Sequence, residues 1–104
     1  MKNMTTKPEC PIAKACEIVG DTWTLLIIRE LLSGVKRFNE LQQVLGINSR
    51  TLTERLQKLV KEKILERMVI AHEMPPRVEY KLTKKGEDLS KIVADLKKFG
   101  QKYL

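Results

Sequence analysis

Residues 38–82 read FNELQQVLGINSRTLTERLQKLVKEKILERMVIAHEMPPRVEYKL, and this stretch decides the fold. A helical pattern over 39–45 is followed by the turn Gly46-Ile47-Asn48 and by a second helical pattern over 49–62. Two strand-like runs then meet at Pro75-Pro76. The order of helix, tight turn, helix and hairpin predicts a winged helix-turn-helix, whose second helix enters a DNA groove. The sequence therefore favours a binding protein over a catalyst.

The second helix of this motif has two faces. Apolar residues recur at the spacing of a buried helical stripe, namely Leu52, Leu56, Leu59 and Val60. We expect Gly46 to adopt the left-handed backbone of a sharp turn and Ser49 to be the N-cap. The opposite face is polar, which is typical of any solvated helix, but its place in the motif favours DNA. With the wing and the preceding strand, the predicted DNA contacts are Arg37, Ser49, Arg50, Thr51, Glu54, Arg55, Lys58 and Arg77.

The residues before the motif predict two helices. Pro11 suits the first position of a helix that Gly20 ends, and Asp21 is a good N-cap for the next helix, over 22–33. That second helix is apolar nearly all round, so we expect it at the buried centre of the domain, with Trp23 in a core role.

Short elements flank the motif. A strand is expected over 35–38, followed by a helix that Asn39 caps, with Gln42 at capping-box spacing. The residues expected to face inward from that helix are Phe38, Leu41, Val44 and Leu45. The hairpin strands are predicted over 65–74 and 77–82, and the second alternates apolar and polar residues as a half-buried strand does.

The C-terminal segment predicts one long helix over 84–104, capped by Thr83. Its apolar stripe is longer than the core of a small domain needs. We therefore expect this helix to hold a dimer, although the stripe is also compatible with packing on the core of one chain. The stripe consists of Leu89, Ile92, Val93, Leu96, Phe99 and Tyr103.

Composition bounds the class of protein. The 104 residues suit a single domain, 1–104, and the net charge of +7 favours an anionic partner such as nucleic acid. The longest apolar run, over 25–28, is far shorter than the ~20 residues that span a bilayer, so no membrane partner is expected. Residues 1–9 are polar, without the apolar centre of a signal peptide. We expect a flexible tail and a cytoplasmic protein.

Enzymatic chemistry finds little support in the sequence. Two cysteines and one histidine are too few for a closed zinc site of four such ligands. There is no P-loop, dinucleotide fingerprint or GxSxG elbow, so no cofactor and no catalytic activity are expected. A catalytic pair of Cys10 or Cys16 with His72 has no local support.

Cys10 is nonetheless the best candidate for a chemical switch. It precedes Pro11 at the cap of the first helix, where the positive end of the helix dipole lowers a thiol pKa. Cys16 lies on an apolar stripe, and we expect it to be an inert core residue. The two cannot pair within one helix, because six residues rise about 9 Å and bridged Cα atoms lie within about 7 Å. The alternative is that Cys10 is an unreactive cap thiol.

Taken in order, several short motifs resemble the HxlR-type family of bacterial and archaeal winged-helix regulators, over about residues 10–96. One mild departure is Glu62-Lys63-Ile64, which stands where such chains often carry a glycine between the reading helix and the wing. The motifs are Cys10-Pro11-Ile12, Gly20-Asp21-Thr22-Trp23, Arg37-Phe38-Asn39-Glu40-Leu41, Gly46-Ile47-Asn48-Ser49-Arg50-Thr51-Leu52, Pro76-Arg77-Val78-Glu79-Tyr80 and Leu82-Thr83-Lys84-Lys85-Gly86.

The resemblance implies a cytoplasmic homodimeric transcriptional regulator, expected to be a repressor, that binds an inverted repeat in double-stranded DNA. It implies that the reading helix is 49–62, that the wing is 72–77, and that the first and last helices, including Ile12, form the dimer interface. In some such proteins the cysteine that matches Cys10 senses electrophiles or oxidants, which implies a reactive small-molecule inducer.

Two other functions are compatible with a winged helix. The fold can serve as a protein-interaction module, or as a basic nucleic-acid binder without sequence preference. Docking to a protein gives no reason for Arg50, Lys58 and Arg77 to lie on the two groove-facing elements. Competition with random DNA distinguishes the specific binder from the non-specific one.

Overall fold

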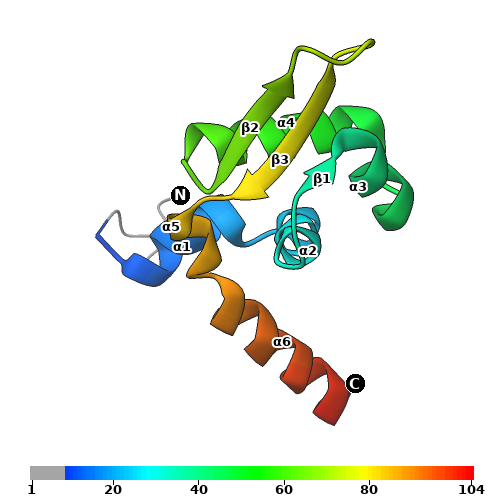
Figure 1. The fold of residues 1–104 in the computed structure, drawn as a ribbon. Coiled ribbons are helices and arrows are strands. Elements are labelled where there is room, and N and C mark those ends of the chain that lie inside the picture. Colours follow the sequence, from blue (N-terminus) through cyan, green and yellow to red (C-terminus); the bar gives the residue numbers. More distant parts are fainter. Residues whose placement is uncertain (1–8) are drawn as a thin grey trace.

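Nine secondary-structure elements follow one another along residues 9–104, the part of the chain that the computed structural model describes. The predicted fold class is confirmed, because the chain is mainly helical and carries the small antiparallel sheet of a winged helix-turn-helix (Figure 1). The tail predicted over 1–9 lies outside the described residues except for Glu9. The elements are α1 (Pro11–Val19), α2 (Thr22–Leu31), β1 (Lys36–Arg37), α3 (Phe38–Leu45), α4 (Ser49–Lys61), β2 (Leu65–Ile70), β3 (Arg77–Leu82), α5 (Lys84–Glu87) and α6 (Ser90–Tyr103).

The three strands form one antiparallel sheet in the order β1, β3, β2. Leu65 of β2 lies opposite Leu82 of β3, and Ile70 lies opposite Arg77. The predicted strand over 65–74 is too long, because β2 ends at Ile70. Prolines have no N–H to donate to a ladder, which is why pairing stops before Pro75-Pro76. In Figure 1 the hairpin projects from the body of the chain beside α4, as a wing does.

The core forms where α2, α3 and α4 meet the sheet. Ile27 and Ile28 of α2 are fully buried, and Trp23 packs against the core from the same helix, in the role expected for it. Helix α2 is buried on the face that bears Ile27, Ile28 and Leu31, as expected for the centre of the domain, whereas Leu25 and Leu26 on another flank are only partly covered. The buried apolar residues are Ile27, Ile28, Leu31, Leu41, Ile47, Leu52, Leu56, Leu59, Ile64, Leu65, Tyr80 and Leu82.

The N-cap of helix α3 lies two residues earlier than the sequence predicts. This cap is Arg37, whose backbone N–H donates to Glu40 Oε1 at 2.7 Å, so Asn39 and Gln42 do not form the capping box. The chain leaves β1 at Arg37 in an extended conformation and turns there directly. Val44 was expected to face inward, but its side chain is 57% exposed, because it lies at the edge of the apolar face rather than within it.

The turn before α4 is closed by Asn48 rather than by Ser49. Its side-chain Oδ1 accepts hydrogen bonds from the backbone of Arg50 at 2.8 Å and Thr51 at 3.1 Å, which makes Asn48 the N-cap. Gly46 has φ of 63°, so the predicted left-handed turn is confirmed. This pair of contacts fixes the direction in which α4 leaves the turn.

The end of α4 places Lys63 in the left-handed region, with φ of 63°. The backbone of Ile64 donates to the Leu59 carbonyl at 2.9 Å, and that of Lys63 donates to the Val60 carbonyl at 3.0 Å. This is the hydrogen-bond pattern of a Schellman motif, whose left-handed residue is usually glycine. A lysine therefore occupies the position where the sequence already departs from the family pattern.

Lys63→Gly should raise the free energy of unfolding by about 1 kcal/mol, because left-handed backbone costs a residue with a Cβ roughly 1–2 kcal/mol and the entropy of glycine offsets part of that gain. Urea unfolding at one fixed protein concentration measures the difference. Lys63→Ala is the control, since it removes the charge and keeps the Cβ. An equal gain from both variants would mean that the charge, and not the backbone, is the cause.

The predicted helix over 84–104 is two helices, broken at Asp88 and Leu89. Thr83 does cap the first of them, because its hydroxyl accepts from the backbone of Gly86 at 3.1 Å. The two segments pack on different elements: α5 on β3 and α6 on α2. A single straight helix cannot meet both surfaces, and Figure 1 shows α6 leaving the body of the chain at an angle to α5.

Candidate nucleic-acid interface

The outer face of α4 carries most of the residues that the sequence predicts to meet DNA. Arg50 has 87% of its side chain exposed, and its Nε lies 3.5 Å from Glu54 Oε2. An exposed pair of this kind contributes little stability, so the guanidinium can exchange Glu54 for another acceptor. Ser49 and Lys58 are exposed as well, whereas Thr51 is partly buried. These side chains form a polar ridge along the helix.

Arg55 is placed differently from the other predicted contacts. Its Nε donates to Asp21 Oδ2 at 2.9 Å, and only 30% of its side chain is exposed. Asp21 is the N-cap of α2 and accepts from the backbone of Thr24 at 3.1 Å. The hydroxyl of Thr24, which is fully buried, donates to the other carboxylate oxygen at 2.5 Å. The structure therefore gives Arg55 a partner within the chain.

The electrostatics of Asp21 agree with this contact. Burial alone raises the pKa of its carboxyl, but the hydrogen bonds from Thr24 and Arg55 outweigh burial and lower that pKa below its ordinary value. A carboxyl with a lowered pKa contributes stability above its unfolded-state pKa and loses that contribution as the pH falls through the folded-state value. The Asp21 carboxyl is therefore ionised at neutral pH.

A second contact joins the same parts of the chain. The Nζ of Lys58 donates to the backbone carbonyl of Glu17, near the end of α1. The segment that links α1 to α2 thus lies along one flank of α4. Beside these contacts, a hollow of about 600 Å³ lies between the α1–α2 link and α4. The hollow is lined by Cys16, Glu17, Gly20, Asp21, Glu54, Arg55 and Lys58.

On the other flank of α4, a hollow of about 470 Å³ faces the wing. Its polar rim contains Gln57, Lys61 and Arg67, none of which is among the predicted DNA contacts. Helical periodicity places Gln57 and Lys61 on the same face as Arg50, at i+7 and i+11, so this signal was present in the sequence. Arg67 is exposed on β2 and had no local signal, because only the folded hairpin brings it beside α4.

The wing tip brings together two arginines that are far apart in the sequence. Arg37 and Arg77 line one cleft of about 320 Å³ with Glu73. The Nη2 of Arg77 lies 2.8 Å from Glu73 Oε2, and its Nε lies 3.0 Å from Glu79 Oε2 at an angle unsuited to a hydrogen bond. Two carboxylates thus offset the charge of Arg77. Arg37 lies 3.9 Å from Glu40 and stays more exposed.

Helix α6, which lies away from the wing (Figure 1), has an apolar surface. No residue of α6 is buried, and most residues of the dimer interface predicted on the first and last helices are about half exposed or more. Leu89 and Val93 are the partly buried members. The exposed members, with the exposed fraction of each residue, are Ile12 (75%), Ile92 (48%), Leu96 (50%), Phe99 (58%) and Tyr103 (63%).

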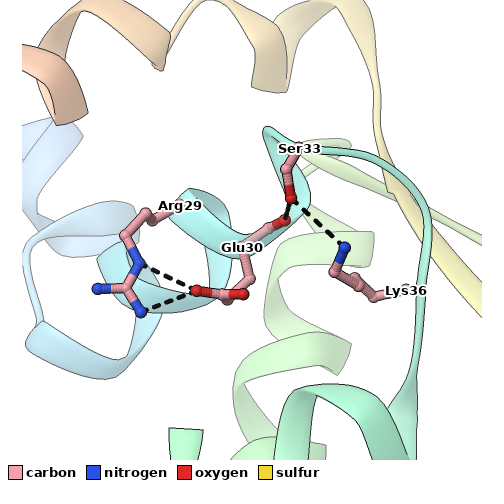
Figure 2. Close-up of polar contacts among 4 residues, drawn as sticks. All are labelled: Arg29, Glu30, Ser33 and Lys36. Atoms are coloured by element: carbon pink, nitrogen blue, oxygen red, sulfur yellow. Dashed lines mark hydrogen bonds and ion pairs between the residues drawn. The ribbon is translucent and has the colours of Figure 1, made fainter. Parts of the chain in front are cut away.

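A groove of about 750 Å³ runs between α2 and α6 beside this surface, with Leu25, Leu26 and Val93 among its walls. Arg29 also lines the groove, but its Nε and Nη2 donate to Glu30 Oε2 at 3.1 and 2.8 Å, as Figure 2 shows. In the same view Ser33 donates to the Glu30 carbonyl at 2.8 Å, which closes the last turn of α2. The charge of Arg29 is therefore paired locally, and Lys97 is a second cation that lines the groove.

The two cysteines differ from the prediction in one respect. Cys10 is the N-cap of α1, as expected, and is partly buried, with a side chain that makes no capping hydrogen bond. Cys16 was predicted to be a core residue, but it is exposed. Helix α1 has no buried residue and packs against the core through Ile18 and Val19 at its C-terminal end, so Cys16 stays exposed and lines the hollow beside α4.

Other kinds of site find no support among the described residues. His72 is exposed on the hairpin, and Figure 1 shows the hairpin tip and α1 on opposite sides of the chain, so no Cys–His pair forms there. Within 9–104, no three side chains of His, Cys, Asp or Glu are grouped so that they could hold a metal ion. None of the helices in that range has both the length and the apolar character needed to span a membrane.

Residues 18–104 match a family model described as HxlR-like helix-turn-helix. The chain belongs to this family. An uncharacterized HTH-type transcriptional regulator of Mycobacterium tuberculosis is 42% identical over 93 residues, which make up 89% of the chain and 58% of that relative. The HxlR-type chain thus spans little more than half of the relative's length, and the resemblance expected from the sequence motifs is confirmed.

Two solved structures share the fold of this HxlR-type chain. The redox regulator HypR in its oxidized form has a TM-score of 0.86 and 34% identity, over 91% of this chain and 98% of HypR. The diamide-treated YodB of Bacillus subtilis has a TM-score of 0.74 and 33% identity, over 93% of this chain and 97% of YodB. Both similarities cover the helix-turn-helix, the wing and most of the flanking helices.

Proposed function

We propose that this chain acts as a homodimeric transcriptional regulator that recognises an inverted repeat in double-stranded DNA in the cytoplasm. The observation that supports it most is the polar ridge of α4, which stands between two hollows and carries Arg50 at its N-terminal end. A helix that projects in this way can enter a major groove, where its first turn meets the base edges. Relatives that are named HTH-type transcriptional regulators agree with this reading.

Roles within the interface follow from exposure. We assign base reading to Arg50 and Thr51 at the start of α4, with Ser49 and Glu54 beside them. Arg37, Lys58 and Arg77 are assigned to the sugar–phosphate backbone, where a flexible cation positions the duplex without reading sequence. Because Glu73 and Glu79 offset its charge, Arg77 should contribute less than Lys58.

The dimer follows from the surface that one chain leaves uncovered. Leu96 of α6 lines the groove along α2, where Arg29 is paired with Glu30, and Ile12 of α1 is an exposed apolar residue outside that groove. A second copy offers the same apolar surface, and covering such a surface gains about 25 cal/mol per Å². Two-fold symmetry then imposes symmetry on the DNA site, with half-site centres about 10 base pairs apart or a multiple of this.

The test begins with selection of bound DNA from a random pool. A selected inverted repeat should compete far better than random DNA, and the logarithm of its affinity should fall steeply with the logarithm of salt, by about 0.9 for each neutralised phosphate. A non-specific binder would show the salt dependence without the preference. A protein-interaction module would show neither.

Arg50→Ala should lose the preference at one base pair in each half-site, because an arginine–guanine contact is worth roughly 1–3 kcal/mol of discrimination. Affinities for the selected site and for single-base variants of it measure the loss. Lys84→Ala, on exposed α5, removes the same charge away from the interface and should leave the preferences unchanged. If Arg50→Ala also left them unchanged, Arg50 would not read a base.

A redox-active inducer is the second candidate, favoured by similarity to a redox regulator and to a protein crystallised after diamide treatment. We propose that Cys10 responds, either through a disulfide between two subunits or, as a single thiolate, by addition to an electrophile such as a quinone. Diamide takes two electrons and two protons from two thiols and should alter operator affinity of the wild type but not of Cys10→Ser. Because Cys16 is also exposed, Cys16→Ser is the matched control and should respond as the wild type does. A Cys10→Ser variant that still responded to diamide as the wild type does would exclude Cys10 as the sensor.

A further inference from the structure

The segment between α1 and α2 holds a fixed anion against the middle of the reading helix. Asp21 accepts three hydrogen bonds: from the backbone of Thr24 at 3.1 Å, from its hydroxyl at 2.5 Å, and from Arg55 at 2.9 Å. Because Thr24 is fully buried in α2, the carboxylate cannot move away with the arginine. The contact therefore ties α4 to a rigid part of the core across 34 positions of sequence.

A phosphate contact by Arg55 would compete with this arrangement. Its Nε is already used, its side chain is only 30% exposed, and its charge is compensated at 2.9 Å. A protein cation that is already paired gains little binding free energy from a phosphate contact. Its partner carboxylate would lose its own counter-charge when the cation moves to the phosphate. Arg55 thus has the geometry of a support rather than that of a DNA contact.

We propose that Arg55 and Asp21 position the reading helix, and that this pair, without touching DNA, determines how sharply the protein discriminates its operator. Arg55 lies five residues beyond Arg50, about 7.5 Å along the helix axis. A restraint at that point limits rotation of α4 about its axis, and such rotation would carry the guanidinium of Arg50 away from a base edge. The inference rests on the proposed DNA-binding function.

Lys58 provides a matched comparison on the same flank. Its ammonium has three donors, and the structure uses one of them on the Glu17 carbonyl, which carries no full charge. The side chain is exposed, so Lys58 can keep this contact and still meet a phosphate. Removing Arg55 or Lys58 changes the net charge of α4 by the same amount. Only the removal of Lys58 should reduce the number of counterions that DNA releases when the protein binds.

The experiment compares Arg55→Gln, Asp21→Asn, the double variant and Lys58→Gln in the full chain, on the selected operator and on random DNA over a range of salt. Asp21→Asn keeps an N-cap side chain that accepts from Thr24. Lys58→Gln should lower the salt slope by about 0.9 and weaken both DNAs alike. Arg55→Gln should leave the slope unchanged and lower the operator-to-random ratio about tenfold, as expected for one misplaced base contact.

Asp21→Asn should lower that ratio by a similar factor, and the double variant should lose no more than either single variant, because both remove one contact. Urea unfolding confirms that each variant is fully folded under the binding conditions, so a loss of stability alone would leave the ratio unchanged. A salt slope that falls in Arg55→Gln as in Lys58→Gln, or losses that add in the double variant, would overturn the inference. A wild type without sequence preference would overturn the proposed function as well.

Discussion

Leu96→Glu should turn the protein into a monomer that binds its operator about 10²–10⁴-fold more weakly, since only one half-site is then held at a time. The reason is the position of Leu96, which is half exposed at the centre of the apolar stripe of α6 and lines the groove along α2. A carboxylate there would lose its water on burial without gaining a partner. Sedimentation of the purified variant measures the change in mass, and a binding titration measures the affinity.

Lys98→Glu is the position-matched control, because it places the same carboxylate on the opposite face of α6, which is exposed. This variant should sediment as a dimer. If Leu96→Glu also sedimented as a dimer, or if a monomeric form bound the full operator as tightly as the wild type, the α6 interface would be wrong and the second copy would have to dock elsewhere.

Gly86→Ala should lower the free energy of unfolding by about 3 kcal/mol, the upper range for overpacking in a close contact. A Cβ at position 86 would lie 2.3 Å from the carbonyl oxygen of Ile64, which is backbone and already accepts hydrogen bonds from Thr83. Neither side can yield without disturbing the base of the hairpin. Urea unfolding of the variant beside the wild type measures the effect.

Gly100→Ala should, in contrast, raise the free energy of unfolding. No atom lies within 4 Å of a Cβ built at Gly100, which is in the interior of α6. Alanine is favoured over glycine in such a position by roughly 0.5–1 kcal/mol. A variant at position 86 that unfolded no more easily than the wild type would show that the hairpin base shifts at low cost.

The order of elements could be predicted because local signals agree with the final packing. Gly46 marks the turn of the motif, Pro75-Pro76 mark the tip of the wing, and the stripe of Leu52, Leu56 and Leu59 fixes the buried face of α4. Each signal acts over a few residues. The local conformational preferences and the tertiary packing therefore favour the same structure.

Details that depend on distant residues could not be predicted in this way. Both Asn48 and Ser49 are good N-caps, and the direction of the turn decides between them. The break between α5 and α6 depends on tertiary packing, because α5 packs on β3 and α6 packs on α2. The exposure of Cys16 depends on how α1 meets the core. Local periodicity contains none of this information.

In the candidate interface, too, some features could be predicted from local sequence signals and others depend on distant residues. Periodicity placed Arg50 on the outer face of α4 and could also have placed Gln57 there. It could not show that Arg55 has a partner within the chain, because that partner is Asp21, at the start of another helix. Arg67 reaches the flank of α4 only through the hairpin. Charge composition indicates an anionic partner, but tertiary contacts decide which cations are left for it.

The absence of any buried residue in α6 has a consequence for gene control. If α6 is covered only in the proposed dimer, two chains must associate to form the active regulator. At low expression the concentration of dimer then grows with the square of the concentration of chain, because folding of the interface is linked to assembly. Halving the supply of chain would reduce the dimer about fourfold in that regime. Promoters under this control would respond to growth and dilution with a threshold, even when no inducer is present.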